Sequence, residues 1–166
     1  DMTGYAWKPI GYSTTPSNPN FSGKAFNGTL DGNNKTIANI TYSGADNYYG
    51  VFGYIEGGAV YDLNVRNPQI NSTGSYVGGL VGKINLTDSR LVNCNIIGGS
   101  SSYVKGAGYV GGFAGNVVGG TIELSGSSIN VTCNGQYGGG FIGEMTTDTS
   151  VVTLNDCYAT GAVNVT

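Results

Sequence analysis

The chain has 166 residues, of which 30 are glycine and 39% are apolar, whereas only 10% are charged and the formal net charge is −3. This apolar content is enough for one sizeable core and excludes a disordered chain. The seven basic residues are scattered singly and no apolar run is long enough to cross a bilayer, which excludes nucleic-acid binding and a membrane-spanning segment.

Residues 1–25 are predicted to form an N-terminal loop or cap region. Residues 13–20, STTPSNPN, place two prolines among Ser, Thr and Asn, a composition typical of loops. The preceding WKPIGY, residues 7–12, fits either a first strand or a cap. Residues 26–42, FNGTLDGNNKTIANITY, are predicted as a variant first repeat in which Asp31, Gly32 and Asn33 form a turn. A calcium loop is not expected there, because the spaced ligands and terminal Glu of an EF-hand are missing.

A glycine-rich phrase then occurs four times, at intervals of 29, 33 and 28 residues. Its copies end at the repeat glycines Gly53, Gly82, Gly115 and Gly143. Two residues after each glycine comes an apolar residue, at Ile55, Ile84, Val117 and Met145. The residue between is mostly polar, at Tyr54, Lys83, Asn116 and Glu144. This alternation predicts a strand with one buried and one exposed face.

A second phrase follows each copy and ends at Leu63, Cys94, Ser127 and Cys157. Aligning its four copies places Ser127 in the column of the two cysteines. It places Gly126 in the column of Asp62, Asn93 and Asp156. The three cysteines, Cys94, Cys133 and Cys157, are too widely spaced for a disulfide framework or a zinc site.

A unit of about 30 residues without helical periodicity cannot bury its apolar face alone, so the units must stack. We therefore predict an all-β fold, a right-handed parallel β-helix (β-solenoid) of about five coils of about 30 residues. It forms one domain over residues 1–166, with repeat coils over 26–166. A propeller is the alternative, but its units need about 40–50 residues. The glycines are expected at corners, where they permit positive φ and close packing.

The phrases GVFG (50–53), GGLVG (78–82), GGFAG (111–115) and GGFIG (139–143) resemble the GLUG motif of repeats in secreted and surface proteins of bacteria and archaea. Residues 26–40 resemble the segment that precedes such repeats, and DCYATGAV (156–163) resembles the segment that follows them. The resemblance implies a parallel β-helix segment of an adhesin-like protein.

No catalytic site is evident. The chain contains no histidine, which excludes Ser-His and Cys-His nucleophiles. Asp62 and Asp156 share a column but lie about three coils, roughly 14 Å, apart, which is too far for cleavage of a glycosidic bond. We expect no enzymatic activity, cofactor or metal site. A carbohydrate-binding or polysaccharide-cleaving β-helix remains the alternative by analogy of fold.

Tyrosines recur in one column at Tyr76, Tyr109 and Tyr137, with Tyr48 one step out of register. Counting alternate strand positions back from Leu80, Phe113 and Phe141 places these tyrosines on the inward side or at a corner. A stacking ladder is favoured over a stripe that binds sugar rings.

The N-glycosylation sequence Asn-x-Ser/Thr occurs eight times, at Asn20, Asn27, Asn34, Asn39, Asn71, Asn85, Asn130 and Asn164. Chance predicts about three, so the density is above random for a glycosylation acceptor in a secreted chain. The alternative is a polar composition typical of strands, which also multiplies Asn and Thr. In Asn39-Ile-Thr41 and Asn130-Val-Thr132, Asn and Thr would project together from a strand.

The final residues, GAVNVT (161–166), still alternate as a strand with no cap after them. Such an end invites further pairing. We expect either a segment of a longer cell-surface protein or subunits that stack end to end into a filament. The expected partners are therefore other copies of the chain or cell-surface glycans and proteins, and the expected location is extracellular.

Overall fold

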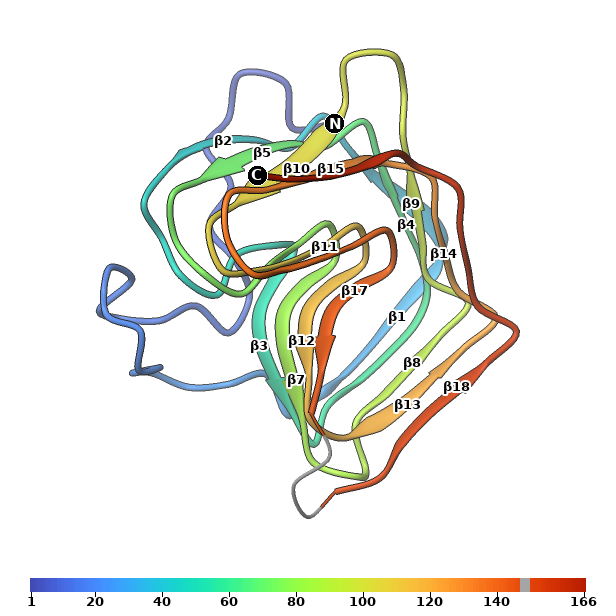
Figure 1. The fold of residues 1–166 in the computed structure, drawn as a ribbon. Helices are drawn as coiled ribbons and strands as arrows, with labels where there is room; N and C mark the ends of the chain where they lie inside the picture. The colour runs from blue at the N-terminus through green and yellow to red at the C-terminus, as the bar shows by residue number, and fades with distance from the viewer. Residues whose placement is uncertain (147–149) are drawn as a thin grey trace.

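The chain is wound into a parallel β-solenoid, shown along its axis in Figure 1. This computed structural model describes residues 1–146 and 150–166, which form β-strands and no helix. Five strands stacked in one sheet are separated by four turns, so the solenoid has about four turns where about five coils were expected. The chain circles counter-clockwise as it advances from the blue to the red end, toward the viewer, which makes the solenoid right-handed. The predicted fold class is confirmed.

Strands at equivalent positions of successive coils pair in parallel and build the faces of the solenoid. One face contains β3 (Phe52–Glu56), β7 (Val81–Asn85), β12 (Ala114–Val117) and β17 (Ile142–Met145). Another contains β2 (Thr41–Gly44), β5 (Gln69–Ser72), β10 (Tyr103–Gly106), β15 (Asn130–Cys133) and β20 (Val163–Val165). A short face contains β6 (Val77–Gly78), β11 (Tyr109–Gly111) and β16 (Tyr137–Gly139).

The largest sheet turns a corner within its two long strands, β1 (Thr29–Ala38) and β4 (Ala59–Arg66). The first half of β4 pairs with β8 (Arg90–Val92), which continues into β13 (Gly120–Glu123) and β18 (Val152–Asn155). Its second half pairs with β9 (Asn95–Ile97), which continues into β14 (Gly126–Ser127) and β19 (Tyr158–Ala159). The two halves therefore form two faces of the solenoid (Figure 1).

Apolar side chains fill the interior in columns, one residue from each coil. Ile55, Ile84 and Val117 stack in register and are fully buried, with Met145 above them in the last coil. The strand alternation in the sequence produces these columns, because every second side chain points inward. Stacking then buries a continuous core that no single coil could bury.

The four repeat glycines also stack in one column, from coil to coil. A Cβ added at Gly82, Gly115 or Gly143 would lie 2.6 Å from the carbonyl oxygen of the repeat glycine in the coil before. None of the four has φ in the left-handed region. Close approach of stacked backbones therefore explains these glycines, and the expected positive φ is absent.

Left-handed backbone is supplied instead by a column of other residues at the corner of the largest sheet. Asp62, Asn93, Leu124 and Asp156 have φ between 50° and 53°, and Asn34 in the first coil has φ 56°. Asn and Asp tolerate this conformation better than most residues with a side chain. The turn at this corner is thus made mainly by Asn and Asp, and glycine is not needed.

The alignment of the second phrase is wrong by two residues in one coil. Leu91 pairs with Ile122 rather than with Leu124. Leu124 therefore occupies the corner column where Gly126 was expected, and Ser125 lies next to Cys94 where Ser127 was expected. Leu124 is 56% exposed, so its apolar character does not mark a core position.

The N-terminal segment forms an incomplete first coil. Ile10 pairs with Phe52, and Phe26 pairs with Ile55, so both extend the face of β3. Residues 12–25 leave the coil between these two points as a loop, the blue excursion in Figure 1. The segment 7–12 therefore contributes a short parallel bridge to the sheet.

Candidate functional site

Four tyrosines form a stacked ladder at the start of the short face. The ring centroids of Tyr48, Tyr76, Tyr109 and Tyr137 lie 4.7, 4.7 and 5.0 Å apart, with interplanar angles of 15°, 16° and 9°. Tyr48 is in register with Tyr76 and is not one step out of register, because the shorter phrase of its coil omits a residue after the tyrosine. The faces of the inner rings cover one another, so no sugar ring can stack on them.

A polar column runs beside this tyrosine ladder, on the outward side of β3, β7, β12 and β17. Lys83 places its ammonium 5.5 Å from the centre of the Tyr76 ring and 5.7 Å from that of Tyr54. Asn116, which is 3% exposed, donates from Nδ2 to Oε2 of Glu144 at 2.8 Å. Burial lowers the pKa of Lys83 and raises the pKa of Tyr54 to about 12.

The N-terminal loop covers the first rungs of the tyrosine ladder. Phe21 packs edge-on against Tyr48 and Tyr54, with centroid distances of 5.3 and 4.8 Å. The Tyr48 hydroxyl donates to the carbonyl of Pro19 at 2.7 Å. A hollow of about 280 Å³ lies between this loop and the coil beneath it. Polar groups that line it are used internally, since Asn47 donates to the Pro16 carbonyl and the Tyr49 hydroxyl to the Trp7 carbonyl.

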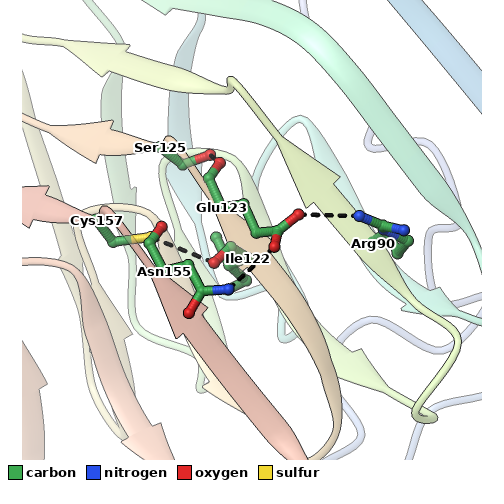
Figure 2. A network of polar contacts seen from close by, with 6 residues as sticks. All are labelled: Arg90, Ile122, Glu123, Ser125, Asn155 and Cys157. Carbon is green, nitrogen blue, oxygen red and sulfur yellow. Dashed lines mark hydrogen bonds and ion pairs between the residues drawn. The ribbon is translucent and has the colours of Figure 1, made fainter.

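A second polar cluster links three coils on the outside of the largest sheet (Figure 2). Arg90 Nη2 lies 2.9 Å from Oε2 of Glu123, and Asn155 Nδ2 donates to Oε1 of Glu123 at 3.0 Å. The hydrogen bond from Asn155 and the contact with Arg90 lower the pKa of Glu123. This cluster was not predicted from the sequence, although opposite charges 33 residues apart, close to one repeat, were a usable signal.

Two carboxylates in columns that were weighed for catalysis accept hydrogen bonds from asparagine in the neighbouring coil. Asp62 accepts a hydrogen bond of 2.6 Å from Asn93, and Glu144 accepts one from Asn116. Asn93 and Leu124 separate Asp62 from Asp156 in the corner column. Asp148 lies outside the described residues. Within residues 1–146 and 150–166, no three Asp, Glu or Cys side chains gather in a group that could hold a metal ion.

The cysteines are free thiols in the described structure. Cys94 and Cys133 are fully buried, and burial raises the pKa of Cys94 to about 12. Cys157 is half-buried two coils from Cys94, with Ser125 between them, so their thiols are too far apart for a disulfide.

The eight predicted glycosylation sites differ in exposure. Five are exposed, at Asn20, Asn27, Asn34, Asn130 and Asn164, and three are half-buried, at Asn39, Asn71 and Asn85. Asn39 donates its Nδ2 to Asp1 and Thr3, and Asn85 donates its Nδ2 to the Tyr54 hydroxyl. The amide nitrogens of these two are therefore already occupied.

The last coil exposes apolar columns that the coil beneath it buries. Met145, Val163 and Val165 are 51%, 44% and 50% exposed, whereas their partners Val117, Val131 and Cys133 are at most 1% exposed. Leu154 is 38% exposed above the fully buried Ile122. The last coil thus keeps core residues although nothing in the described structure covers them.

The solenoid, with its glycine column and its tyrosine ladder, places the chain in the class of parallel β-solenoids. No family model matches the chain. Halomucin of Haloquadratum walsbyi is 34% identical over 158 residues, and the match covers 82% of this chain but only 2% of halomucin. A crystal structure from Bacteroides ovatus, described as a "putative immunoglobulin A1 protease", superposes with a TM-score of 0.62 at 20% identity.

That superposition covers 99% of this chain and 58% of the Bacteroides protein. At this identity the similarity establishes the fold alone. The chain spans less than two thirds of both similar proteins. The described residues include no helix long and apolar enough to cross a membrane.

Proposed function

We propose that this chain is a non-enzymatic structural segment of a secreted or cell-surface protein, a stiff β-solenoid within a stalk, adhesin or fibre. The glycine-rich phrases and the similarity to a stretch of halomucin support a place among GLUG-motif repeat proteins and an extracellular location. The carboxylates of Asp62, Glu123 and Glu144 accept hydrogen bonds from neighbouring coils, as Figure 2 illustrates for Glu123. These observations favour a structural role over cleavage of a polysaccharide.

The observation that carries this proposal is the difference between the two ends of the solenoid. At the N-terminal end, Met2 donates its N–H to the Ala38 carbonyl, and Trp7, Ile10 and Phe26 pack against the core. At the C-terminal end, the apolar columns and the edges of β17, β18 and β20 are uncovered. An open edge of this kind accepts another parallel strand in every column.

We infer that the C-terminal end pairs with a further coil of the same architecture. Head-to-tail stacking of separate copies, the filament alternative, is disfavoured because the N-terminal segment would have to leave the coil that it covers. Molar mass measured by light scattering over a range of concentrations separates these cases. Open-ended polymers that grow with concentration would favour the filament, and a constant mass favours a segment extended within one chain.

The pairing itself can be tested by adding one coil. A copy of residues 135–166 joined after Thr166 continues the register, because Val165 pairs with Cys133. We expect one cooperative unfolding transition at a higher temperature, since the added coil buries the exposed columns. An unchanged midpoint with a disordered tail would contradict the proposal.

A depolymerisation assay on acidic and neutral polysaccharides, in which no cleavage is expected, tests the enzymatic alternative.

A further inference from the structure

The outer face of the sheet formed by β2, β5, β10, β15 and β20 differs from the other outer faces. Its outward side chains form two rows across the coils, Thr41–Gln69–Tyr103–Asn130 and Ser43–Asn71–Lys105–Thr132–Asn164. Four of the eight glycosylation sequences lie on this sheet or directly before it, those of Asn39, Asn71, Asn130 and Asn164. We call these two outward rows the asparagine face.

Side chains on the asparagine face do not pair with one another from coil to coil. Elsewhere, outward side chains pair from coil to coil, as Arg90, Glu123 and Asn155 do. In the described part of the chain, no side chain of the asparagine face forms a hydrogen bond with another side chain. The amide nitrogens of this face therefore have no side-chain acceptor among the described residues.

Asn130 is held in a suitable position for modification. It is exposed on β15, and its Oδ1 accepts a hydrogen bond of 3.1 Å from the backbone N–H of Ala162. This bond fixes the side chain while leaving Nδ2 free. Thr132, the third residue of the sequence Asn-Val-Thr, points to the same side of the strand.

An aromatic ring lies directly beside Asn130 on the neighbouring strand. Tyr103 of β10 pairs with Asn130 in register, and it is 37% exposed. Tyr103 also lines a shallow hollow of about 310 Å³, together with Thr41, Ser43 and Gln69. Unlike the stacked rings of the tyrosine ladder, Tyr103 has tyrosine in neither neighbouring coil, where Gln69 and Asn130 stand instead. A sugar ring attached to Asn130 can pack on it, as amphipathic aromatic rings favour.

We propose that the asparagine face carries N-linked sugars, at Asn130 and also at Asn71 and Asn164, and that the first sugar on Asn130 packs against Tyr103. The reaction joins Nδ2 to the anomeric carbon of a sugar carried on a polyprenyl phosphate or diphosphate. The bond from that carbon to the phosphate oxygen breaks, the phosphate leaves with the electron pair, and a base of the glycosyltransferase takes one amide proton. No group is oxidised or reduced.

This inference rests on the proposed extracellular location, because the lipid-linked donor and its transferase act on exported chains. The full chain is secreted from a host that performs N-glycosylation. Its sugars are then removed with an amidase in heavy-oxygen water, and mass spectrometry of the peptides locates each marked asparagine. We expect marks at Asn71, Asn130 and Asn164, and none at Asn39 or Asn85. A chain without sugar at Asn130 would overturn the proposal.

Two matched variants test the recognition sequence. Thr132→Ser keeps the hydroxyl group and is expected to keep the sugar on Asn130. Thr132→Val keeps the β-branched shape of the strand residue but removes the hydroxyl, and the sugar on Asn130 should be lost. Equal occupancy in both variants would contradict the assignment.

The packing against Tyr103 has its own measurement. Removal of the sugars should lower the melting temperature by about 2–4 °C, the shift that corresponds to one good contact in a domain of this size. Tyr103→Ala should keep the sugar on Asn130 and lose most of this shift. An undiminished shift in Tyr103→Ala would overturn the packing. The coil-addition test uses unglycosylated protein, so the structural proposal and this one can fail separately.

Discussion

Gly115 illustrates how little space separates successive coils. A Cβ at this position would lie 2.6 Å from both the Gly82 carbonyl oxygen and the Val77 nitrogen. These are backbone atoms held in parallel ladders on both sides, so they cannot move without breaking hydrogen bonds. The identity of the residue is therefore imposed by the neighbouring coil rather than by its own φ.

Substitution Gly115→Ala should lower the free energy of unfolding by about 2–4 kcal/mol, because a single added methyl forces the backbones apart. Gly28→Ala is the matched control. Its Cβ would meet only the Phe26 ring, at 3.5 Å, so we expect a change within about 0.5 kcal/mol. Chemical denaturation measures both. Equal effects in the two variants would show that stacking does not select glycine.

Ser127, unlike Gly115, is a residue that the neighbouring coils do not require, because its buried hydroxyl forms no hydrogen bond within the described residues. It is fully buried in the column of Ile96 and Ala159, and its hydroxyl has no hydrogen-bond partner among the described residues. Ser127→Ala should therefore stabilise the fold by about 1 kcal/mol. Ser125→Ala should instead cost about 1–3 kcal/mol, because Ser125 donates to the Glu123 carbonyl and accepts from the Cys94 N–H. A loss of stability in Ser127→Ala would point to an unseen partner for its hydroxyl.

At the scale of single elements, the strands could be predicted in register from the sequence, but the corners could not. Each copy of the glycine-rich phrase keeps the same strand alternation after its repeat glycine, so the face of β3, β7, β12 and β17 could be predicted in register although the copies are unequally spaced. The corner column is occupied by Asn, Asp and one Leu, so its members share a backbone conformation but no side-chain type. Leu124 therefore resembled a core residue of the repeat, and the alignment shifted by two.

The same limitation applies to the candidate site. The tyrosine ladder was visible because one residue type recurs at each coil. The choice between an inward and a corner position could not be made from the sequence, because Tyr48 and Tyr76 have left-handed backbone, with φ 57° and 60°, and this interrupts the strand alternation. The contact between Tyr103 and Asn130 joins different residue types across one repeat, and no column of identical residues indicated it.

Replacing Leu124 tests the account of the corner. Left-handed backbone costs a residue with a branched side chain about 1–2 kcal/mol, and Asn relieves part of this cost. Because Leu124 is 56% exposed, little packing is lost. We expect Leu124→Asn to raise the free energy of unfolding by about 0.5–1 kcal/mol in urea denaturation. Val131→Asn, at a buried position of a strand, should be strongly destabilising and serves as the contrast.

At the scale of the whole molecule, buried tyrosines make the fold sensitive to alkali. Burial raises the pKa of Tyr42, Tyr48 and Tyr54 to about 12, from an ordinary value near 10. Between these values the folded chain keeps protons that the unfolded chain loses. The contribution to stability is therefore complete below pH 10 and is lost as the pH rises toward 12.

The free energy of unfolding should accordingly fall between about pH 10 and pH 12, and Tyr54→Phe should flatten this fall. Denaturation at a series of pH values, with tyrosinate absorbance recorded in parallel, measures both. Ionisation of Tyr42, Tyr48 and Tyr54 with a midpoint near pH 10, in a chain that remains folded, would contradict the assignment.

The unequal ends of the solenoid also give it a direction of assembly. Residues 1–28 pair with residues 51–59 and with Ala38 and pack against the core, so the first coil has its partners as soon as the chain that follows has folded onto it. Each later coil adds to an edge that already exists and leaves a new edge of the same kind. A chain that emerges with its N-terminus first, during synthesis or export, can thus fold one coil at a time. Each new coil then pairs with a coil that has already folded.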